Sequence, residues 1–315
     1  MKVIVFITCL IVEITAKLDD YEQWISFKDQ YSRHYGHEEE KLRFQIFQNR
    51  LREIEDHNAK YERGEVEWFK GITPFADRTE EEFHSLYHGQ DSTKLLFKDS
   101  LGIYQADPNQ KLPASFDWRT EGAVLPVRSQ EESSACWIFS SLGSVEGQIA
   151  IHKKQRIPLS PQNIIDCHPK GHLGGYKEYA YQFIKDHGIS SEANYPFVVK
   201  KGTCKKDVPK VITTLSGHKL IKSTENDLIS AIANIGPVGV SVSTKNWNLY
   251  NGGVFNNTGC INGVIDHEVL AVGYTEDYII IKNSWGAGWG DKGYMKIARG
   301  RNMCKINQNA MYPIL

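Results

Sequence analysis

The sequence contains no hydrophobic run long enough to cross a membrane. A membrane-spanning helix needs about 20 apolar residues in succession, and the mostly apolar run from Val3 to Val12 is much shorter. It follows a single lysine and is followed by the small residues Thr15 and Ala16, an order typical of a secretory signal peptide. We therefore expect residues 1–16 to be a signal peptide, with a buried N-terminal strand as the alternative.

The sequence also lacks a strong charge of either sign. Its 37 Lys and Arg residues nearly balance its 38 Asp and Glu residues, and both signs are mixed along the chain. This balance gives no electrostatic reason to expect nucleic acid or a membrane surface as a partner. Internal repeats and low-complexity tracts are absent, and the length of 315 residues fits a globular protein of about two domains.

Cysteine is scarce, with six residues in the chain. Secretion implies an oxidising compartment, in which cysteines pair. Because Cys9 would leave with the signal peptide, an odd number remains and one thiol needs its own explanation. The remaining cysteines are Cys136, Cys167, Cys204, Cys260 and Cys304.

Residues 17 to about 100 are strongly charged and show a helical pattern. Apolar residues recur at helical spacing and predict two amphipathic helices, and Thr79 precedes acidic residues as the N-cap of a third, shorter one. A turn-rich stretch over 99–113 predicts an exposed linker. The apolar stripes are Trp24, Phe27 and Tyr31, and then Phe44, Phe47, Leu51 and Ile54.

The rest of the chain predicts a helical part followed by a β-rich part, an α+β class. The segment SSACWIFSSLGSVEGQIAIH has an apolar face at helical period, with two serines as possible caps and Cys136 in the first turn. The runs VGVSVS, EVLAVGYT, DYIIIKNSW and GYMKIA are β-branched or aromatic and predict strands. A thiol at a helix start is stabilised as thiolate, and thus nucleophilic, by unpaired backbone N–H groups. A buried, inert cysteine is the alternative.

Three segments together, PVRSQEESSACWIFS, DHEVLAVGY and IKNSWGAGWGDKGY, resemble the papain family of cysteine proteases. His267 lies 267 − 136 = 131 residues after Cys136 and Asn283 lies 283 − 136 = 147 after it, within the family spacing of about 130 to 150. The resemblance implies that Cys136 attacks the substrate, His267 is its ion-pair partner and Asn283 orients the imidazole. It also places Gln130 in the oxyanion hole, with Trp285 and Trp289 shielding the site on the primed side.

The N-terminal region resembles a cathepsin L type of propeptide. Arg50 and Thr73 depart from this pattern, because the family usually has asparagine at both positions. The resemblance implies an inhibitory helical propeptide over 17–111, whose tail runs through the cleft in reverse, and a mature domain over 112–315. The papain-like fold then has a helical lobe over about 123–220 and a β-barrel-like lobe over about 221–315. The matching residues are Glu39, Arg43, Phe47, Ile54, Asn58, Gly71, Phe75 and Asp77.

The loop before Cys136 departs most from the family. It reads Glu131 to Ala135 where the family has a glycine- and cysteine-containing segment, so conformations easy for glycine become costly and nearby carboxylates raise the thiol pKa. Ser133 and His172 replace one family disulfide. The resemblance implies two others, Cys167–Cys204 and Cys260–Cys304, which leaves Cys136 free. Cys167 with His168 and His172 suggests a metal only weakly, and we expect neither metal nor cofactor.

Matching the family's main specificity pocket brings two opposite charges, Lys177 and Glu268, into it. They either pair and narrow the pocket, which disfavours large apolar substrate side chains, or both reach out to solvent. Gly174 and Gly175 correspond to the pair beside which substrate backbone runs, and Asn256 begins a glycosylation sequon. The pocket residues are Tyr176, Lys177, Ser241, Ile265, Glu268 and Asn309.

These patterns favour a monomeric endopeptidase made as a zymogen, with the family's occluding loop for dipeptide release absent. The expected partners are protein or peptide substrates, its own propeptide and cystatin-type inhibitors. We expect it in the secretory pathway, in a lysosome-like vesicle, digestive lumen or extracellular fluid. A weakly active or inactive papain-fold protein that only binds is the main alternative, and an inhibitor acting through its propeptide is another.

Overall fold

The computed structural model describes residues 18–86, 100–171, 173–212 and 214–315. The expected signal peptide, residues 1–16, lies outside this set, as do residues 87–99 of the expected propeptide tail and His172. Across the described ranges, no helix is both long and apolar enough to span a membrane.

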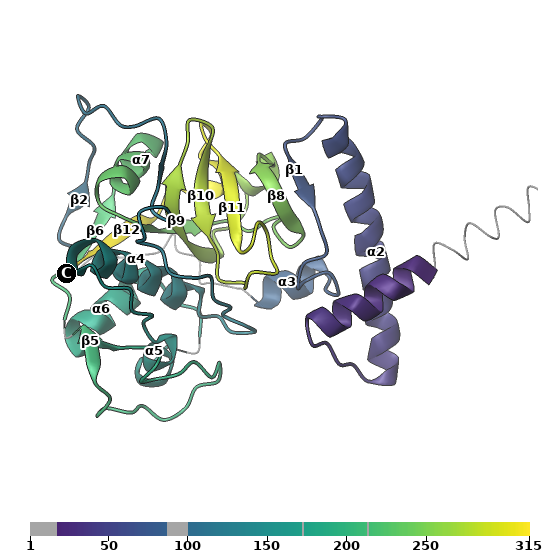
Figure 1. Ribbon diagram of the computed structural model, residues 1–315, viewed down its shortest axis with the longest axis horizontal. Coiled ribbons are helices and arrows are strands. Elements are labelled where there is room, and N and C mark those ends of the chain that lie inside the picture. The colour runs from purple at the N-terminus through teal and green to yellow at the C-terminus, as the bar shows by residue number, and fades with distance from the viewer. Residues whose placement is uncertain (1–17, 87–99, 172, 213) are drawn as a thin grey trace, which may run out of the picture.

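Two helices cross in the N-terminal region, as the apolar stripes predict. The first covers residues 18–30 and the second is α2, His37–Glu62. Trp24 and Phe27 from the first pack against Phe47 from α2, with ring centroids 5.2 and 5.1 Å away. Burial of these aromatic faces holds the crossing together, and Figure 1 shows the pair standing beside the rest of the molecule.

The N-terminal region also gives a strand and a short helix to the interface with the sheet. Strand β1, Trp68–Lys70, pairs antiparallel with β8, Tyr250–Phe255. Helix α3, Glu80–Leu86, follows Thr79, whose Oγ1 accepts from the Glu82 N–H at 3.2 Å while the Thr79 N–H donates to the Glu82 carboxylate at 2.9 Å. This reciprocal capping box fixes the helix start that the sequence predicts.

A ten-stranded sheet forms the centre of the molecule, in the order β1-β8-β11-β10-β9-β7-β12-β6-β2, with β3 paired to β9. Its inner strands are buried on nearly every residue and packed by α7, Glu225–Asn234. The strands not yet given are β2 Ile103–Tyr104, β3 Phe116–Asp117, β6 Gly217–Ile221, β7 Val238–Val242, β9 His267–Tyr274, β10 Tyr278–Lys282, β11 Tyr294–Ala298 and β12 Ala310–Ile314.

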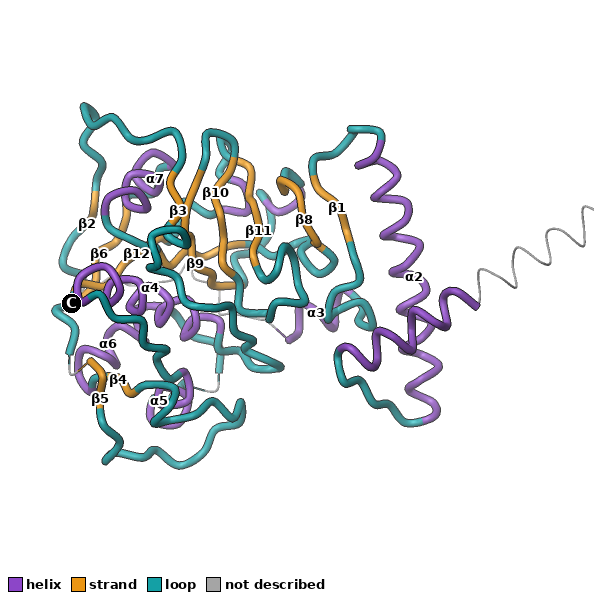
Figure 2. The backbone as a smooth tube through the Cα atoms, in the orientation of Figure 1, coloured by secondary structure: helices purple, strands orange, loops and turns teal. Residues whose placement is uncertain are grey.

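The helical part packs against one side of this sheet (Figure 2). Helix α4, Cys136–Lys153, is buried along almost its whole length, between the sheet and the helices α5, Pro161–Cys167, and α6, Lys177–His187. A small ladder of β4, Ile189–Ser190, and β5, Lys210–Ile212, closes this part. The protein is therefore an α+β fold of a helical and a β-rich lobe, preceded by a helical region.

Two disulfides cross-link the described chain, Cys167–Cys204 and Cys260–Cys304. The second joins two 3-10 turns, η2 Thr258–Cys260 and η3 Met303–Lys305. Because Cys167 is bonded to Cys204, it is not available as a metal ligand. Cys136 is the one cysteine of the described residues that stays free, and it is buried.

Candidate active site

Cys136 is the first residue of α4, but the helix start differs from the sequence prediction. The N-cap is Ala135, which has no side chain able to cap, so the expected serine caps are wrong. The hydroxyl of Ser133 instead donates to the Gln130 carbonyl at 2.5 Å. The first-turn N–H groups thus lack a side-chain acceptor from the cap. The Ile138 N–H donates to the Ala135 carbonyl at 2.9 Å, and the Trp137 N–H hydrogen-bonds the thiol sulfur.

His267 and Asn283 meet on neighbouring strands of the sheet. His267 begins β9, and Asn283 directly follows the adjacent strand β10. The distance from His267 Nε2 to Asn283 Oδ1 is 2.8 Å, and Oδ1 also accepts from the Ser284 N–H at 2.8 Å. An amide oxygen only accepts, so the ring donates through Nε2. In the neutral imidazole, Nδ1 is therefore the basic nitrogen.

The thiol of Cys136 lies against the strand that carries His267. Helix α4 packs on β9, and the backbone N–H groups of Glu268 and Trp137 hydrogen-bond the sulfur and favour its ionised form. Since Glu268 follows His267 directly, the nucleophile and the base come from two facing elements, one in each lobe. The indole of Trp285 stacks on the His267 ring with centroids 4.7 Å apart.

Burial keeps both groups uncharged in this form of the protein. It raises the pKa of the Cys136 thiol to about 12, with the charge of Glu268 as the second cause. Burial also lowers the pKa of His267 to about 4, against the opposing effect of its bond to Asn283. A thiol and a neutral imidazole are the resting state here, because desolvation disfavours the ion pair. The carboxylates that raise the thiol pKa are Glu268 and, to a smaller extent, Asp266, both on the strand side of the site, rather than the expected carboxylates of the altered loop.

Gln130 is fully buried, six residues before Cys136 in the chain. Its Nε2 donates to the Ser133 carbonyl at 2.7 Å, and its Oε1 accepts from the Ser284 hydroxyl at 2.6 Å. One Nε2 proton is used in this way, which leaves the second as a donor. Glu131, next in the chain, has a φ of 51°, a left-handed conformation that costs a non-glycine residue free energy. The free-energy cost expected from replacing the family's glycine in this loop is therefore present at Glu131.

Lys177 and Glu268 pair inside the expected pocket, so the alternative in which both reach solvent is wrong. The Lys177 ammonium contacts the Glu268 carboxylate and donates to Ser241 Oγ at 2.7 Å, and Ser241 donates to Glu268 at 2.9 Å. Lys177 is only 1% exposed. Burial raises the pKa of Glu268 to about 7, against the lowering effect of Lys177. Tyr176 and Ile265 are buried nearby.

The remaining expected residues lie around this centre with different neighbours. A side chain at Gly175 would come within 2.7 Å of the Trp137 ring, so close packing requires glycine there. Gly174 precedes it on the same loop. The backbone carbonyl of Asn309 accepts from the Ser241 N–H at 3.2 Å. Trp289 packs edge-on against Trp285 at 4.9 Å.

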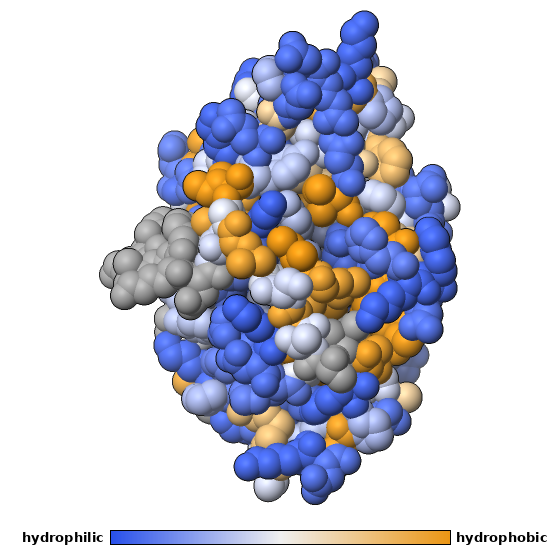
Figure 3. All heavy atoms as spheres, turned by 90° about the vertical axis from the view of Figure 1, so that its left-hand side faces the viewer, coloured by the Kyte–Doolittle hydropathy of each residue, from blue (hydrophilic) through white to orange (hydrophobic). Residues whose placement is uncertain are grey.

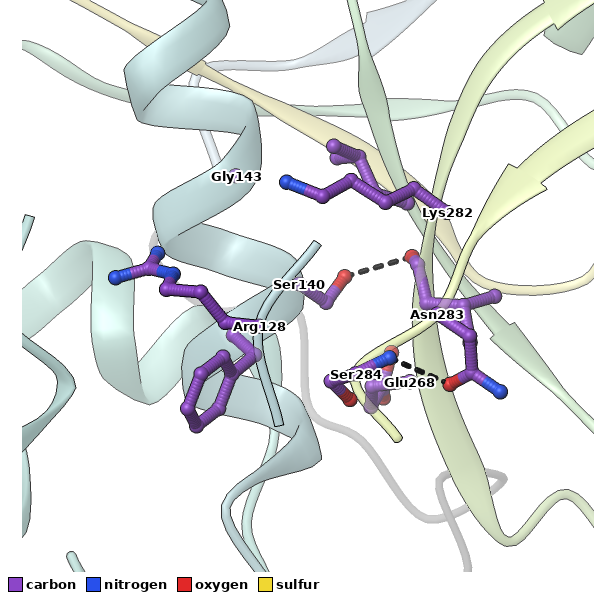
Figure 4. A pocket seen from close by; sticks show the side chains of 10 residues that line it. Arg128, Ser140, Gly143, Glu268, Lys282, Asn283 and Ser284 are labelled. Carbon is purple, nitrogen blue, oxygen red and sulfur yellow. Dashed lines mark hydrogen bonds between the residues drawn. The ribbon is translucent and has the colours of Figure 1, made fainter. Parts of the chain in front are cut away.

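A small cavity with a mixed polar and apolar lining lies behind the site, between α4 and the strands β9 and β10 (Figure 4). Lys282 faces it, and burial lowers the pKa of its ammonium to about 8, while Glu146 raises it. Arg128 bonds Glu146 at 2.8 Å. These residues have no local sequence signal, because their contacts join separate segments of the chain.

Two known protein families match this chain. The model of the papain family cysteine proteases matches residues 112–314, and that of the cathepsin propeptide inhibitor domain matches residues 24–83. The chain belongs to the papain family of cysteine proteases. It is a cathepsin L-like cysteine endopeptidase produced as a proenzyme with an inhibitory propeptide.

Its relatives match over nearly their whole length. A cathepsin L-like proteinase of Phaedon cochleariae is 38% identical, with all of both chains covered, and digestive cysteine proteinase 3 of Homarus americanus is 35% identical, with 99% of both covered. The solved structure of digestive procathepsin L 3 from Tenebrio molitor larval midgut is 37% identical, with a TM-score of 0.86, and 94% of this chain and 99% of that chain are covered.

Aromatic residues of the propeptide pack against Trp285, the residue that stacks on His267. Phe75 and Phe83 each lie edge-on to Trp285, with centroids 5.3 Å away.

The two residues that depart from the usual propeptide pattern, Thr73 and Arg50, both have hydrogen-bond partners in the structure. Thr73 donates to the Asn248 carbonyl at 2.6 Å, and the Arg50 guanidinium donates to the Arg78 carbonyl at 3.1 Å.

Ion pairs join the propeptide to residues beside the catalytic candidates. The Arg78 guanidinium contacts the Glu132 carboxylate in the altered loop, and Arg33 lies 3.8 Å from the same oxygen. In α3, His84 Nδ1 is 3.6 Å from the carboxylate of Asp266, the residue before His267. The altered loop is therefore part of the propeptide interface, which the sequence alone did not indicate.

Proposed function

We propose that Cys136 and His267 are the nucleophile and base of this endopeptidase, with Asn283 orienting the imidazole and Gln130 serving the oxyanion hole. The observation that carries the proposal is the 2.8 Å contact between His267 Nε2 and Asn283 Oδ1, which directs Nδ1 to act as the base. Removal of the propeptide would rehydrate the site, and the thiolate–imidazolium pair would then become accessible.

The proposed reaction follows from these positions. His267 Nδ1 takes the thiol proton as sulfur attacks the peptide carbonyl carbon. The Cys136 backbone N–H and the second Nε2 proton of Gln130 stabilise the resulting oxyanion. The C–N bond then breaks and His267 gives its proton to the departing amine, which leaves a thioester. Water, deprotonated by His267, attacks the thioester, and the thiol is restored as the acid product leaves.

The specificity pocket is the second part of the proposal. The buried Lys177–Glu268 pair, joined through Ser241, fills space that would otherwise accept a large apolar side chain. We expect small or polar residues to be preferred two positions before the scissile bond. Tyr176, Ile265, Asn309 and the backbone at Gly174 and Gly175 would complete the substrate contacts, with Trp285 and Trp289 on the primed side.

Labelling and turnover of the matured enzyme test the catalytic assignment. A thiol-directed epoxide should modify Cys136 one-to-one, and a fluorogenic peptide panel should be cleaved with a preference for small or polar residues over Leu or Phe. Asn283→Ala should lower kcat by about tenfold or more, and Cys136→Ala should abolish turnover. Failure of both labelling and cleavage in correctly processed protein would instead support a papain-fold binding protein, which the strained Glu131 favours.

We further propose that residues 17–111 are removed by cleavage near Leu112, and that the mature enzyme is a monomer inhibited by cystatin-type proteins. Its disulfides fit the oxidising secretory pathway, and similarity to digestive proteinases supports a digestive lumen or an acidic lysosome-like vesicle. Asn256, half-buried after β8, would carry a glycan. N-terminal sequencing, light scattering and enzymatic deglycosylation of secreted protein would test these points.

A further inference from the structure

The C-terminal end of the propeptide adds a strand to the mature domain's sheet. Strand β2 runs parallel to β6, on the side of β6 away from β12. The N–H groups of Leu220 and Lys222 donate to the carbonyls of Gly102 and Tyr104 at 3.1 and 3.0 Å, and the Leu101 N–H donates to the His218 carbonyl at 2.9 Å. These bonds satisfy the backbone of β6 along its outer edge.

Side chains of the mature domain hold the same segment in one register. The Tyr104 hydroxyl lies 2.9 Å from Ser230 Oγ, and its ring packs edge-on against Tyr312 with centroids 6.0 Å apart. The Ala106 N–H donates to the Asp227 carboxylate at 2.7 Å, and Ala106 is 8% exposed. Asp227 and Ser230 both lie on α7. This helix therefore binds the aromatic Tyr104 and, two positions later, the small Ala106.

A third contact extends this binding surface along α7. The side chains of Gln110 and Asn234 exchange two hydrogen bonds, at 2.9 and 3.0 Å. In contrast, the exposed Asn109 bonds only within its own turn, its N–H donating to Asp107. The segment thus combines backbone pairing with side-chain contacts, the pattern by which a sheet edge recognises an extended peptide.

This surface is separate from both the inhibitory contacts and the active site. Strands β1 and β2 occupy opposite ends of the strand order, and Figure 1 shows β2 at the end of the molecule away from α2 and α3. Figure 3 looks onto that end and shows apolar surface near its middle. Of the described apolar residues, Leu101 and Ile103 are among the exposed ones, at 49% and 66%.

We propose that the outer edge of β6 together with the adjoining face of α7 is a peptide-binding site, and that residues 100–111 remain bound there after the chain is cut near Leu112. The inference rests on the proposed cleavage position but not on the activity of Cys136. The occupant is this chain's own segment, because its register and its Tyr104 and Ala106 contacts are already formed. Its departure would leave β6 with unpaired backbone groups at a sheet edge.

Maturation of the full precursor by an added protease gives the first test. Native gel filtration followed by mass spectrometry should find a fragment containing residues 100–111 in the enzyme peak. A labelled peptide of residues 100–111 should then bind the matured enzyme, stripped of that fragment and treated with a thiol-directed epoxide, saturably by fluorescence anisotropy. If the epoxide fails to react because Cys136 is inactive, the peptide is not cleaved and the binding measurement still holds.

Variants distinguish the proposed register from general adhesion. Tyr104→Ala in the peptide and Asp227→Asn in the enzyme should each weaken binding about tenfold, whereas Asn109→Ala, the matched control in the same peptide, should not. Peptide hydrolysis by untreated enzyme should be unchanged by Asp227→Asn. The proposal is overturned if the peptide shows no saturable binding, or if Tyr104→Ala and Asn109→Ala bind equally.

Discussion

Among single residues, Glu268 acts both on the proposed specificity pocket and on the thiol of Cys136. It pairs with Lys177 inside the pocket, and its charge contributes to the raised pKa of the Cys136 thiol. Because its own pKa is raised from 4.5 to about 7, its contribution to folding stability is fully present below pH 4.5 and is lost as the pH rises through 7. The same titration removes the negative charge of Glu268 from the proposed pocket as the pH falls through 7.

This titration predicts a pH-dependent preference two positions before the scissile bond. As the pH falls from 8 to 5, Glu268 takes up a proton and the proposed pocket loses a negative charge, so an acidic substrate side chain becomes favoured. The ratio of kcat/KM for a Glu substrate over its Gln counterpart should rise severalfold over this range. In Glu268→Gln the ratio should be independent of pH, and a wild-type ratio that stays flat would contradict the assignment.

Glu132 offers a second prediction at this scale. Its carboxylate meets Arg78 and Arg33 of the propeptide but is 58% exposed, so each pair contributes about 1 kcal/mol or less. Glu132→Gln should shorten the half-time of precursor activation by about two- to fivefold, and added salt should reduce this difference. Glu131→Gln, one residue earlier, is the matched control. Equal activation of the two variants would show that the ion pairs do not hold the propeptide.

Among the secondary-structure elements, the helices of the N-terminal region follow from the sequence and the shortest strands do not. The helical stripe through Phe47 and Leu51 predicts α2, and Thr79 predicts the start of α3, because each depends on neighbours within one or two turns. Strands β1 and β2 have three and two residues and exist through pairing with β8 and β6. Pairing with distant segments overrides local preference, so no local signal predicts them.

Gly253 tests the pairing of β1 with β8. Its φ is +81°, and an added Cβ would lie 2.3 Å from the Glu67 carbonyl at the start of β1. Gly253→Ala should therefore remove most of the extra stability of the precursor over the matured enzyme, as measured by their unfolding midpoints in urea. Gly300 has a φ of +90° with nothing within 4 Å, so Gly300→Ala adds backbone strain alone. Gly300→Ala should lower the urea midpoints of the precursor and of the matured enzyme equally. If Gly253→Ala did the same, the pairing of β1 with β8 would not stabilise the precursor.

Across the whole molecule, the sequence predicts which residues form the candidate site, but it does not predict the contacts that position them. Cys136, His267 and Asn283 are recognisable because their order and spacing match a family pattern. The buried contacts of Arg128 with Glu146, and of Lys177 with Glu268, join segments far apart in the chain. Their geometry and their effect on pKa values depend on burial, which only the folded chain sets.

His84 lies between the propeptide and the residue before His267, and it gives the last prediction. The nearby carboxylates of Asp266 and then Glu80 raise the pKa of His84 from 6.5 to about 9. A raised pKa means that its stabilising contribution is fully present below pH 6.5 and is lost as the pH rises through 9.

The thermal midpoints of the precursor and of its His84→Ala variant should therefore differ most near pH 6.5 and converge above about pH 9.5. His37→Ala is the matched control, since His37 is exposed at the start of α2 and lies 3.7 Å from Glu38 only. Its midpoint should follow the wild-type curve throughout. If the difference in thermal midpoint between the precursor and His84→Ala were the same at every pH, the side chain would act through packing. The proposed ion pair between His84 and Asp266 would then be wrong.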